Sequence, residues 1–434
     1  MNVYFHTFGC KANQYDTELV RQAFADQGVV VVVDPADADL AVVNSCTVTG
    51  ESEAKLRHFV RRLGRTGCPS VVMGCAAARD GGGAIAALPG VRAVVGGADP
   101  MQVLQAAGLG TSPPFPLSAT RRGGQGVRSG GTEAGVRSRG WLKIQDGCDE
   151  HCTFCATTLA RGANRSRPIP ELVAEARALS EHHAELVLTG VHIGTYGRDR
   201  GSGLGTWDSE VPTRAPNPEP RGPSLGRLLE ALIAAVPRVR FRLSSIEATE
   251  VDDAIARLLI GAPRQLAAHL HAPLQSGSNR VLKRMGRHWY TADAYRARVE
   301  WLAARLPVFG LGADVIAGFP GETAADHRAT LALIEALPFT YLHVFPYSAR
   351  PGTAAMRLGE EVPAPAVRDR ARELRLLGDA KKEAYREKRK GQTGDGVVSG
   401  HAAGRLELLT EDYLSVYLPT AAWDGRARCE VTVD

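Results

Sequence analysis

Three cysteines, Cys148, Cys152 and Cys155, lie within eight positions in the spacing Cys-x3-Cys-x2-Cys. They follow residues 141–145, whose alternation of apolar and polar residues predicts a β-strand. Soft thiolates at the end of a strand select iron–sulfur, zinc or copper centres rather than magnesium or calcium. A structural zinc site would need a fourth ligand, and His151 is poorly placed to chelate the same ion because it adjoins Cys152. Three ligands on a four-iron cluster would leave one iron open to a substrate or cofactor.

The alternative is that these are buried structural thiols, since free cysteine is among the most buried residue types. The chain has only eight cysteines in all, so three of them in one loop argue against that interpretation.

Three further cysteines, Cys10, Cys46 and Cys75, each follow a predicted strand within residues 1–108. The strand candidates are residues 3–5, 29–33, 40–43, 70–73 and 91–95, and the helix candidates are residues 17–27 and 51–62. Their alternation predicts an α/β domain with a flavodoxin-like parallel sheet. Because the carboxyl ends of parallel strands meet at one edge, we expect these three thiols to form a second metal site. Cys68 and Cys429 lack this placement and are not assigned to a site.

Length and composition describe a globular protein of two or three domains, with 434 residues of which 44% are hydrophobic and 23% are charged. The formal net charge of +5 argues only weakly for an anionic partner, but basic residues gather in residues 121–139 and 381–390. No secretory signal and no apolar run of the ~18 residues needed for a membrane span is visible. We therefore expect a cytoplasmic protein, not associated with a membrane, whose cysteines are reduced metal ligands.

Strand and helix signals alternate again across residues 140–380. The strand candidates are residues 141–145, 185–189, 239–244, 268–274, 312–317 and 341–345, and the helix candidates include residues 171–181, 294–305 and 324–336. Six such units predict a partial (β/α)6 barrel, in which chemistry lies at the C-terminal ends of the strands. The loop that holds Cys148 has this position after the first strand. Residues 199–223 are rich in proline and glycine and are interpreted as a disordered insertion.

The remaining segments connect or follow these two domains. Residues 109–139 have no hydrophobic period and are typical of a linker. Residues 367–390 predict a long charged helix, and residues 381–434 a small antiparallel β-barrel with strands near 396–398, 406–409, 414–417 and 429–433. Small barrels with basic flanks often bind RNA.

The Cys-x3-Cys-x2-Cys spacing is the signature of the radical S-adenosylmethionine superfamily, and the residues around it resemble the methylthiotransferase family. The stretches that support this resemblance are Gly9-Cys10-Lys11-Ala12-Asn13-Gln14, Asn44-Ser45-Cys46-Thr47, Met73-Gly74-Cys75, Arg161-Gly162, Leu188-Thr189-Gly190, Pro273-Leu274-Gln275-Ser276-Gly277 and Gly318-Phe319-Pro320-Gly321-Glu322. The resemblance covers essentially the whole chain, including a C-terminal region similar to the TRAM domain.

The residues after Cys10 separate the branches of this family. Lys11-Ala12-Asn13-Gln14 resembles the branch that acts on N6-threonylcarbamoyladenosine at tRNA position 37. The isopentenyladenosine branch usually has Gln-Met-Asn there, and the ribosomal-protein S12 branch has Pro-Lys-Asn. The chain departs from the family after Cys155, where Ala156-Thr157-Thr158 replaces the usual isoleucine or valine followed by proline.

The resemblance implies a catalytic [4Fe-4S] cluster on Cys148, Cys152 and Cys155 and a second [4Fe-4S] cluster on Cys10, Cys46 and Cys75 as the sulfur source. It implies S-adenosylmethionine as radical source and methyl donor, with C2 of the adenine as the atom modified. The cofactor contacts carried over or inferred beside it are Phe154, Thr189, Gly190, Glu247, Gln275 and Glu322. The expected partners are a tRNA anticodon stem-loop and an electron donor such as a flavodoxin or ferredoxin.

Three alternatives stay open at this point. The substrate could be isopentenyladenosine-37 of tRNA, or an aspartate of ribosomal protein S12. The chain could also be a metal-binding RNA module without catalysis, although such a module would not need a six-unit barrel.

Overall fold

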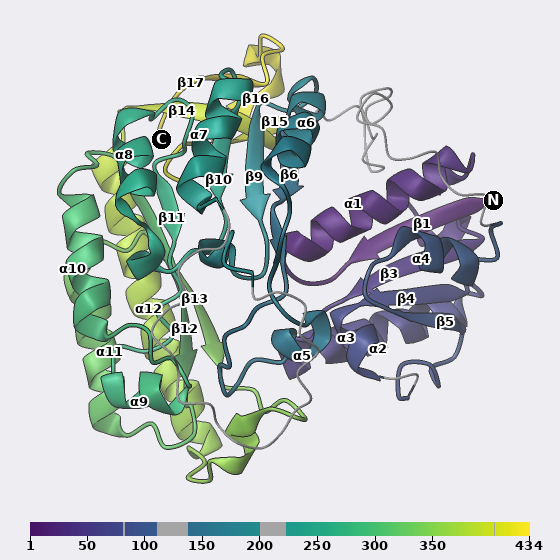
Figure 1. The fold of residues 1–434 in the computed structure, drawn as a ribbon, viewed down its shortest axis with the longest axis horizontal. Helices are drawn as coiled ribbons and strands as arrows, with labels where there is room; N and C mark the ends of the chain where they lie inside the picture. Colours follow the sequence, from purple (N-terminus) through teal and green to yellow (C-terminus); the bar gives the residue numbers. More distant parts are fainter. Residues whose placement is uncertain (81–82, 111–137, 200–222, 403) are drawn as a thin grey trace.

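Figure 1 shows the computed structural model of the chain, in which a smaller α/β part lies beside a larger one. The structure describes residues 1–80, 83–110, 138–199, 223–402 and 404–434. The predicted linker, residues 109–139, and the predicted insertion, residues 199–223, lie almost entirely outside the described residues. None of the described helices is both long enough and apolar enough to cross a membrane.

The N-terminal part is a five-stranded parallel sheet in the order β2-β1-β3-β4-β5, which is the flavodoxin-like order. Its strands are β1 (Asn2–Thr7), β2 (Val30–Val32), β3 (Leu40–Ser45), β4 (Ser70–Gly74) and β5 (Val91–Gly96). Helices α1 (Lys11–Asp26) and α4 (Pro100–Ala106) cover one face of the sheet, and α2 (Gly50–Arg65) and α3 (Cys75–Asp80) cover the other. The predicted flavodoxin-like fold is confirmed.

Helix α1 begins at Lys11, six residues before the predicted start at Thr17. Asn13, Asp16 and Thr17 in its first turns interrupt the apolar period, but they are buried and hydrogen-bonded. Asn13 Nδ2 donates to the carbonyl oxygen of Ser45 at 2.9 Å, and Thr17 Oγ1 accepts from Thr7 at 2.8 Å. The spacing of apolar residues cannot reveal a helix face that is buried but polar, so the prediction missed these turns.

The central part has six parallel strands in two sheets, β10-β9-β6 and β11-β12-β13. Bridges from Phe241 to Leu266 and from Ser245 to His271 join the two sheets into one curved surface. The strands are β6 (Arg139–Lys143), β9 (Glu185–Thr189), β10 (Arg240–Leu243), β11 (His269–His271), β12 (Gly310–Ala317) and β13 (Tyr341–Pro346). The predicted partial barrel is confirmed, but β11 is shorter than predicted because Pro273 has no N–H to donate to a ladder.

Helices cover the outer face of these strands (Figure 1). They are α6 (Ile169–Ser180), α7 (Leu225–Ala235), α8 (Asp253–Gly261), α10 (Ala292–Ala303), α11 (Ala324–Ala336) and α12 (Ala364–Arg389). The main apolar core lies between the two layers and includes Phe241, Leu270 and Leu311. The short elements β7 (Gln145–Asp146), α5 (Thr157–Arg161), β8 (Arg165–Ser166) and α9 (Asn279–Arg284) belong to loops that follow the strands.

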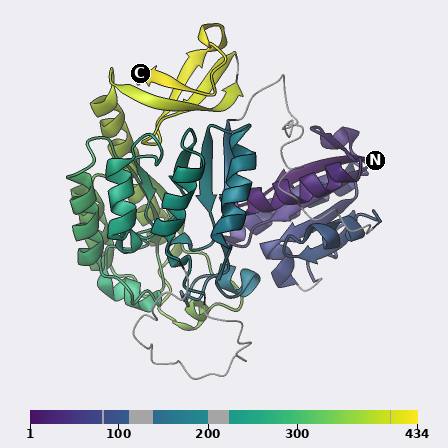
Figure 2. The same cartoon turned by 45° about the horizontal axis from the view of Figure 1, so that its top comes forward.

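A four-stranded antiparallel sheet in the order β16-β15-β14-β17 follows α12. Its strands are β14 (Thr393–Ala402), β15 (Arg405–Leu409), β16 (Ser415–Pro419) and β17 (Arg428–Thr432). Figure 2 shows this sheet lying over the end of the barrel where the strands begin. The buried Arg242 Nη2 donates to the carbonyl oxygen of Thr410 at 2.7 Å and to Glu185 at 3.0 Å, which attaches the sheet to the barrel. The predicted small antiparallel barrel is confirmed as a curled sheet.

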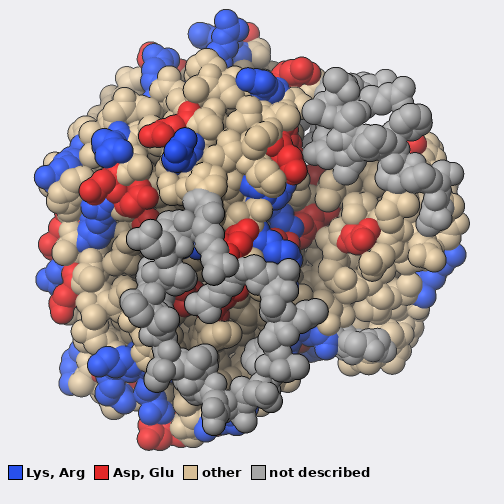
Figure 3. All heavy atoms as spheres, in the orientation of Figure 1, with Lys and Arg blue, Asp and Glu red and all other residues tan. Residues whose placement is uncertain are grey.

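Two arginines of the basic segment 381–390 attach this sheet to helix α12. Arg389 Nε donates to Asp412 at 2.7 Å, and Arg386 pairs with Asp434 at 2.7 Å. Lys381 donates to two backbone carbonyl groups at the end of α11. Basic and acidic side chains are also interspersed on the face shown in Figure 3. Arg386 and Arg389 of this segment are therefore paired within the chain.

The N-terminal part contacts both ends of the series of barrel strands. Helix α1 packs against β6, the first strand. Arg350, shortly after the last strand, forms an ion pair with Glu53 in α2. The backbone N–H of Gly50 donates to Ser348 Oγ at 3.0 Å. These contacts place the carboxyl edge of the flavodoxin-like sheet next to the loop that holds Cys148.

Candidate active site

The Cys148 loop leaves the first barrel strand through a tight turn at Gly147. Gly147 has a φ of +71°, and a Cβ at this position would overlap the carbonyl group of Ala163. The backbone N–H of Cys148 donates to the carbonyl oxygen of Gly162 at 2.9 Å. Further along, Thr153 N–H donates to the carbonyl oxygen of Met285 at 2.9 Å. The loop is therefore fixed at both ends, and its three thiols stay partly accessible.

A cation and an imidazole contact two of these thiols. Arg287 Nη1 lies 3.4 Å from Cys152 Sγ, and His192 Nδ1 lies 3.6 Å from Cys148 Sγ. Burial raises the pKa of Cys152 to about 12, and the charge of Arg287 offsets this only in part. The charges of Cys155 and Cys148 raise the same pKa further, so the three sulfur atoms share one environment. A thiolate there needs a cationic centre to stabilise it.

The second set of thiols converges as the parallel topology predicts. Asn13 Oδ1 lies 3.9 Å from Cys10 Sγ and 3.8 Å from Cys75 Sγ. Gly9, with a φ of +106°, approaches Cys46 so closely that a Cβ on it would be 3.0 Å from the Cys46 sulfur. The three cysteines follow β1, β3 and β4, three neighbouring strands of one sheet. The structure thus brings Cys10, Cys46 and Cys75 together at one edge.

Arg161 connects the two sets of thiols. It ends α5, which begins two residues after Cys155, and its Nε lies 3.1 Å from Cys75 Sγ. Its Nη2 also donates to Asn13 Oδ1 at 2.7 Å and to Asp16 at 2.8 Å. Burial raises the pKa of Cys75 to about 11, against the opposing charge of Arg161.

An ion-pair network supports Arg161 beneath the Cys148 loop. Its Nη1 lies 2.9 Å from Asp146 Oδ1, and Lys143 pairs with both Asp146 and Asp16 at 2.6 and 2.7 Å. Burial alone would raise the pKa of Asp146, but Lys143 and Arg161 outweigh it and lower that pKa to about 2. Since Asp16 belongs to α1 and the other three residues to the barrel, the network fixes the two parts against each other.

The geometry of the thiols does not match a compact site for a single zinc ion. A Zn–S bond of about 2.3 Å in a tetrahedral site places the sulfur atoms about 3.8 Å apart. In neither set, although the structure describes all six cysteines, do the three sulfur atoms lie within 4.8 Å of one another. Thiolates are also the ligands of iron–sulfur clusters, which are larger than a single zinc ion. Arg287 and Arg161 beside the two sets would offset the negative charge of such clusters.

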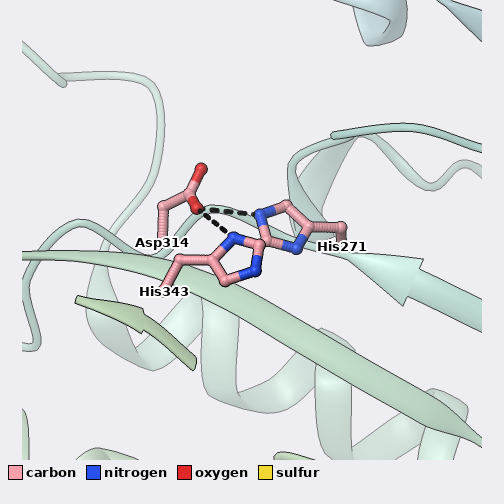
Figure 4. A group of neighbouring side chains, drawn as sticks. All are labelled: His271, Asp314 and His343. Atoms are coloured by element: carbon pink, nitrogen blue, oxygen red, sulfur yellow. Dashed lines mark ion pairs between the residues drawn. The ribbon is translucent and has the colours of Figure 1, made fainter. Parts of the chain in front are cut away.

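Two other groups of side chains are compact enough to hold an ion, but each is already an ion pair. Figure 4 shows His271, Asp314 and His343, which come from the three neighbouring strands β11, β12 and β13. The Asp314 Oδ1 atom lies 3.0 Å from His271 Nε2 and 3.3 Å from His343 Nδ1. Burial alone would raise the pKa of Asp314, but these two imidazoles hold it well below its usual range.

The second compact group contains His192, Glu247 and Glu250. His192 Nε2 lies 2.9 Å from Glu250 Oε1. Burial opposes protonation of His192, but Glu250 outweighs it and holds the pKa of His192 above its usual value. Glu247 pairs with Arg287 and accepts a hydrogen bond from Trp289. Glu250 therefore holds His192 beside Cys148, and Glu247 holds Arg287 beside Cys152.

Most of the predicted cofactor contacts lie at the C-terminal ends of the barrel strands. Thr189 ends β9, and a Cβ on the following Gly190 would be 2.7 Å from Gln145 Oε1. Gln275 has a φ of +63° and bridges to Val315 in β12. Glu247 reaches Cys152 indirectly, through Arg287. Phe154 packs edge-on against Phe319, with ring centres 6.3 Å apart.

Glu322 does not lie with the other predicted cofactor contacts. Its buried Oε2 accepts from the backbone N–H of Gly318 at 2.8 Å and pairs with Arg370 of α12 at 2.7 Å. The carboxylate therefore holds the 318–322 turn against helix α12.

Sequence reasoning missed the residues that join the thiols to each other and to their surroundings. These are Asn13, Arg161, His192, Glu250 and Arg287. Asn13 and Arg161 belong to stretches that resemble the methylthiotransferase family, so this resemblance could have identified them. Nothing in the sequence indicated that Arg287 would reach Cys152, 135 positions away.

Family models match both α/β parts. Residues 2–96 match the Uncharacterized protein family UPF0004, and residues 142–334 match the Radical SAM superfamily. Among solved structures, the radical S-adenosylmethionine methyltransferase TsrM from Kitasatospora setae, bound to cobalamin and a [4Fe-4S] cluster, superposes with a TM-score of 0.54. The sequences are 15% identical, and the match covers 82% of this chain and 76% of that one, so the likeness concerns the fold alone.

Curated relatives cover nearly the whole chain. The threonylcarbamoyladenosine tRNA methylthiotransferase MtaB of Bacillus subtilis is 36% identical over 398 residues, covering 88% of this chain and 81% of the relative. The protein of the same name from Aquifex aeolicus is 32% identical over 425 residues, or 96% of each chain. The tRNA-2-methylthio-N(6)-dimethylallyladenosine synthase of Novosphingobium aromaticivorans is 32% identical, covering 90% of this chain and 85% of that one.

Proposed function

This chain belongs to the radical S-adenosylmethionine tRNA methylthiotransferase family, and from that premise we propose that it adds a methylthio group to C2 of N6-threonylcarbamoyladenosine at tRNA position 37. The single observation that supports this reaction most directly is the pair of thiol sets on two domains, connected by Arg161. A sulfur source next to a centre that activates a C–H bond is what methylthiolation requires.

The cofactors supply the reactive chemistry, and the protein supplies position and shielding. When bound, S-adenosylmethionine and a [4Fe-4S] cluster at Cys148, Cys152 and Cys155 supply the radical chemistry and the methyl group, and a second [4Fe-4S] cluster at Cys10, Cys46 and Cys75 would supply sulfur. Arg287 offsets negative charge beside Cys152, where burial otherwise opposes a thiolate. His192, held by Glu250, stands beside Cys148.

The cofactor-contact residues at the strand ends form the remaining part of the proposed site. Thr189 and Gly190 lie at the end of β9 beside Gln145, and Gln275 presents its amide from a left-handed turn. Phe154 offers a ring edge beside Phe319. Glu247 orients Arg287, and Glu322 acts indirectly by holding the 318–322 turn.

We also propose the domain limits and the partners. Residues 1–108 would bind the second cluster, residues 140–380 would form the radical S-adenosylmethionine barrel, and residues 381–434 would be a TRAM-like unit that contacts RNA. Helix α12 is continuous across the limit at residue 381, so it belongs to both units. The RNA contacted would be the anticodon stem-loop, because position 37 lies there, and the target base must leave its stack to be modified. A flavodoxin or ferredoxin in the cytoplasm would donate the electrons.

Mass spectrometry of tRNA nucleosides tests the proposed function. The chain is expressed in cells that lack their own tRNA methylthiotransferases, and the same cells without it serve as the control. We expect the 2-methylthio form of threonylcarbamoyladenosine to appear only when the chain is present. Appearance of only 2-methylthio-isopentenyladenosine would assign the chain to the other tRNA branch, and methylthiolated S12 with unmodified tRNA would assign it to the protein branch.

A further inference from the structure

The inner face of the open barrel is lined by a row of stacked rings. Tyr413, in the turn between β15 and β16, stacks on His269 at 4.5 Å between ring centres and on Tyr341 at 5.2 Å. The Tyr341 hydroxyl lies 2.9 Å from His269 Nε2 and 3.0 Å from His271 Nδ1. These side chains face away from the helices, which pack on the alternate residues of the same strands.

Lys11 of the N-terminal domain reaches this row of rings. Its ammonium lies 6.0 Å from the centre of the Tyr413 ring, and the guanidinium of Arg242 lies 5.3 Å from the same ring. The side chain is partly buried, because α1 packs against the first barrel strand. Lys11 therefore brings a positive charge from one domain into the interior of the other.

The structure shows no hydrogen-bond acceptor for the Lys11 ammonium among the described residues, and no carboxylate within 4 Å of it. The charged groups that act on Lys11 are Arg139, Arg242, Glu185 and Asp314. Both carboxylates already have partners: Glu185 pairs with Arg139, Arg240 and Arg242, and Asp314 pairs with His271 and His343. A partly buried cation between two further cations is costly unless an anion joins it.

The substrate of the proposed function has such an anion. The threonylcarbamoyl group on N6 of the adenine ends in a carboxylate, whereas an isopentenyl group is an uncharged hydrocarbon. Tyr413 and Tyr341 are partly exposed, so the ring surface that the stacking leaves open can contact the planar carbamoyl unit beside the charge.

Resting on the proposed function, we propose that Lys11 binds the threonyl carboxylate of the substrate nucleoside and so selects it over nucleosides whose N6 group is uncharged. Arg242 adds a second positive charge beside the Tyr413 ring but is already satisfied by Glu185.

The experiment changes the charge on both enzyme and substrate. Reconstituted holoenzyme, as wild type and as Lys11→Met, is assayed on a tRNA with threonylcarbamoyladenosine at position 37 and on the same tRNA with that carboxylate as its methyl ester. Charge-assisted hydrogen bonds predict that the wild type prefers the acid in kcat/KM by on the order of 10- to 100-fold. Lys11→Met should lose activity on the acid by a similar factor and treat acid and ester alike.

Three controls separate recognition from damage to the neighbouring cluster site at Cys10. Iron and sulfide content and the yield of 5′-deoxyadenosine on reduction should match the wild type in Lys11→Met. Lys11→Arg keeps the charge and should retain most of the preference for the acid. Lys55→Met removes an exposed lysine of α2 and should leave every value unchanged.

The two proposals fail in different ways. If the wild type does not methylthiolate the threonylcarbamoyladenosine tRNA at all, the proposed function is overturned. If the wild type does so, but Lys11→Met keeps its full acid-to-ester ratio, only the role of Lys11 is overturned. If Lys11→Met binds less iron than the wild type, Lys11→Arg becomes the deciding variant. Loss of the preference for the acid in Lys11→Arg, with both clusters intact, would also reject the role of Lys11 in binding the carboxylate.

Discussion

The guanidinium Nε of Arg161 lies 3.1 Å from the sulfur of Cys75, although the two residues are 86 positions apart and belong to different domains. Arg161 ends the short helix that follows Cys155, and Cys75 begins a helix of the flavodoxin-like sheet. A displacement of either thiol set would therefore break this contact. The spacing between the two proposed cluster sites depends on this side chain and on its carboxylate partners.

Substituting Arg161 by alanine should destabilise the chain. It would leave Asp16 and Asp146 with Lys143 as their only cation in the network, and we expect a cost of about 2–3 kcal/mol. Guanidinium-chloride unfolding measures this change in the free energy of unfolding. The control is Arg165→Ala, an exposed arginine that bonds only to backbone carbonyls, for which a change within about 0.5 kcal/mol is expected. Equal midpoints for the two variants would contradict the prediction.

Cys10→Ala should separate cleavage of S-adenosylmethionine from sulfur insertion. The substitution removes one of the three thiols that converge beside Asn13 but leaves Cys148, Cys152 and Cys155 intact. We expect the reconstituted variant to hold about half the iron of the wild type, to form 5′-deoxyadenosine on reduction and to make no methylthiolated tRNA. Cys68→Ala, outside both thiol sets, is the matched control and should keep all three properties. Normal product from Cys10→Ala would exclude the second cluster as the sulfur source.

Gly147→Ala should prevent the Cys148 loop from closing. Its added methyl group would overlap the Ala163 carbonyl in addition to the strain of a φ of +71°. Gly162 has the same φ with a ψ of −157°, a region that is nearly restricted to glycine. A Cβ there would come no closer than 3.6 Å to other side chains, so Gly162→Ala tests backbone strain of about 1–3 kcal/mol without a steric overlap. Iron content after reconstitution should fall in Gly147→Ala and stay near the wild-type value in Gly162→Ala. A full complement of iron in Gly147→Ala would show that the loop adapts.

Glu185→Gln should destabilise the chain at neutral pH and lose this effect in acid. Burial alone would raise the pKa of Glu185, but Arg240, Arg242 and Arg139 hold that pKa well below its usual value. The stabilisation is fully present above the unfolded-state pKa of about 4.3 and is lost as the pH falls through the folded-state pKa. We expect Glu185→Gln to cost about 3–5 kcal/mol at pH 7.

The measurement for Glu185 compares unfolding free energies of wild type and variant under identical anaerobic conditions from pH 7 to pH 3. The difference between them should stay constant above about pH 4.5 and shrink below it. Glu230→Gln, an exposed glutamate of α7, should stay within about 0.5 kcal/mol of the wild type throughout. A difference in unfolding free energy that grows as the pH falls would contradict a lowered pKa of Glu185 in the folded chain.

Sequence patterns predicted the elements well where the signal was local. The six barrel strands and the helix at Ala324–Ala336 were found because apolar period and length determine them. The start of α1 was missed because buried polar residues such as Asn13 are satisfied by partners from distant strands. The sequence showed the basic segment 381–390 but not the partners of its arginines. Arg389 pairs with Asp412 and Glu411, and Arg386 pairs with Asp434, which only the folded chain brings near.

The sequence by itself determined the Cys148, Cys152 and Cys155 set, because a spacing of three and two residues within one loop places the thiols together whatever surrounds them. It also determined that Cys10, Cys46 and Cys75 end strands of a parallel sheet, so their convergence followed from topology. Only the tertiary structure decided that Arg161 reaches Cys75, that Arg287 faces Cys152 and that Lys11 enters the barrel, where no described carboxylate pairs with it. These contacts arise from the packing of the two parts against each other. That packing depends on the shape and charge of whole surfaces, and it produces no repeating pattern of residues in the sequence.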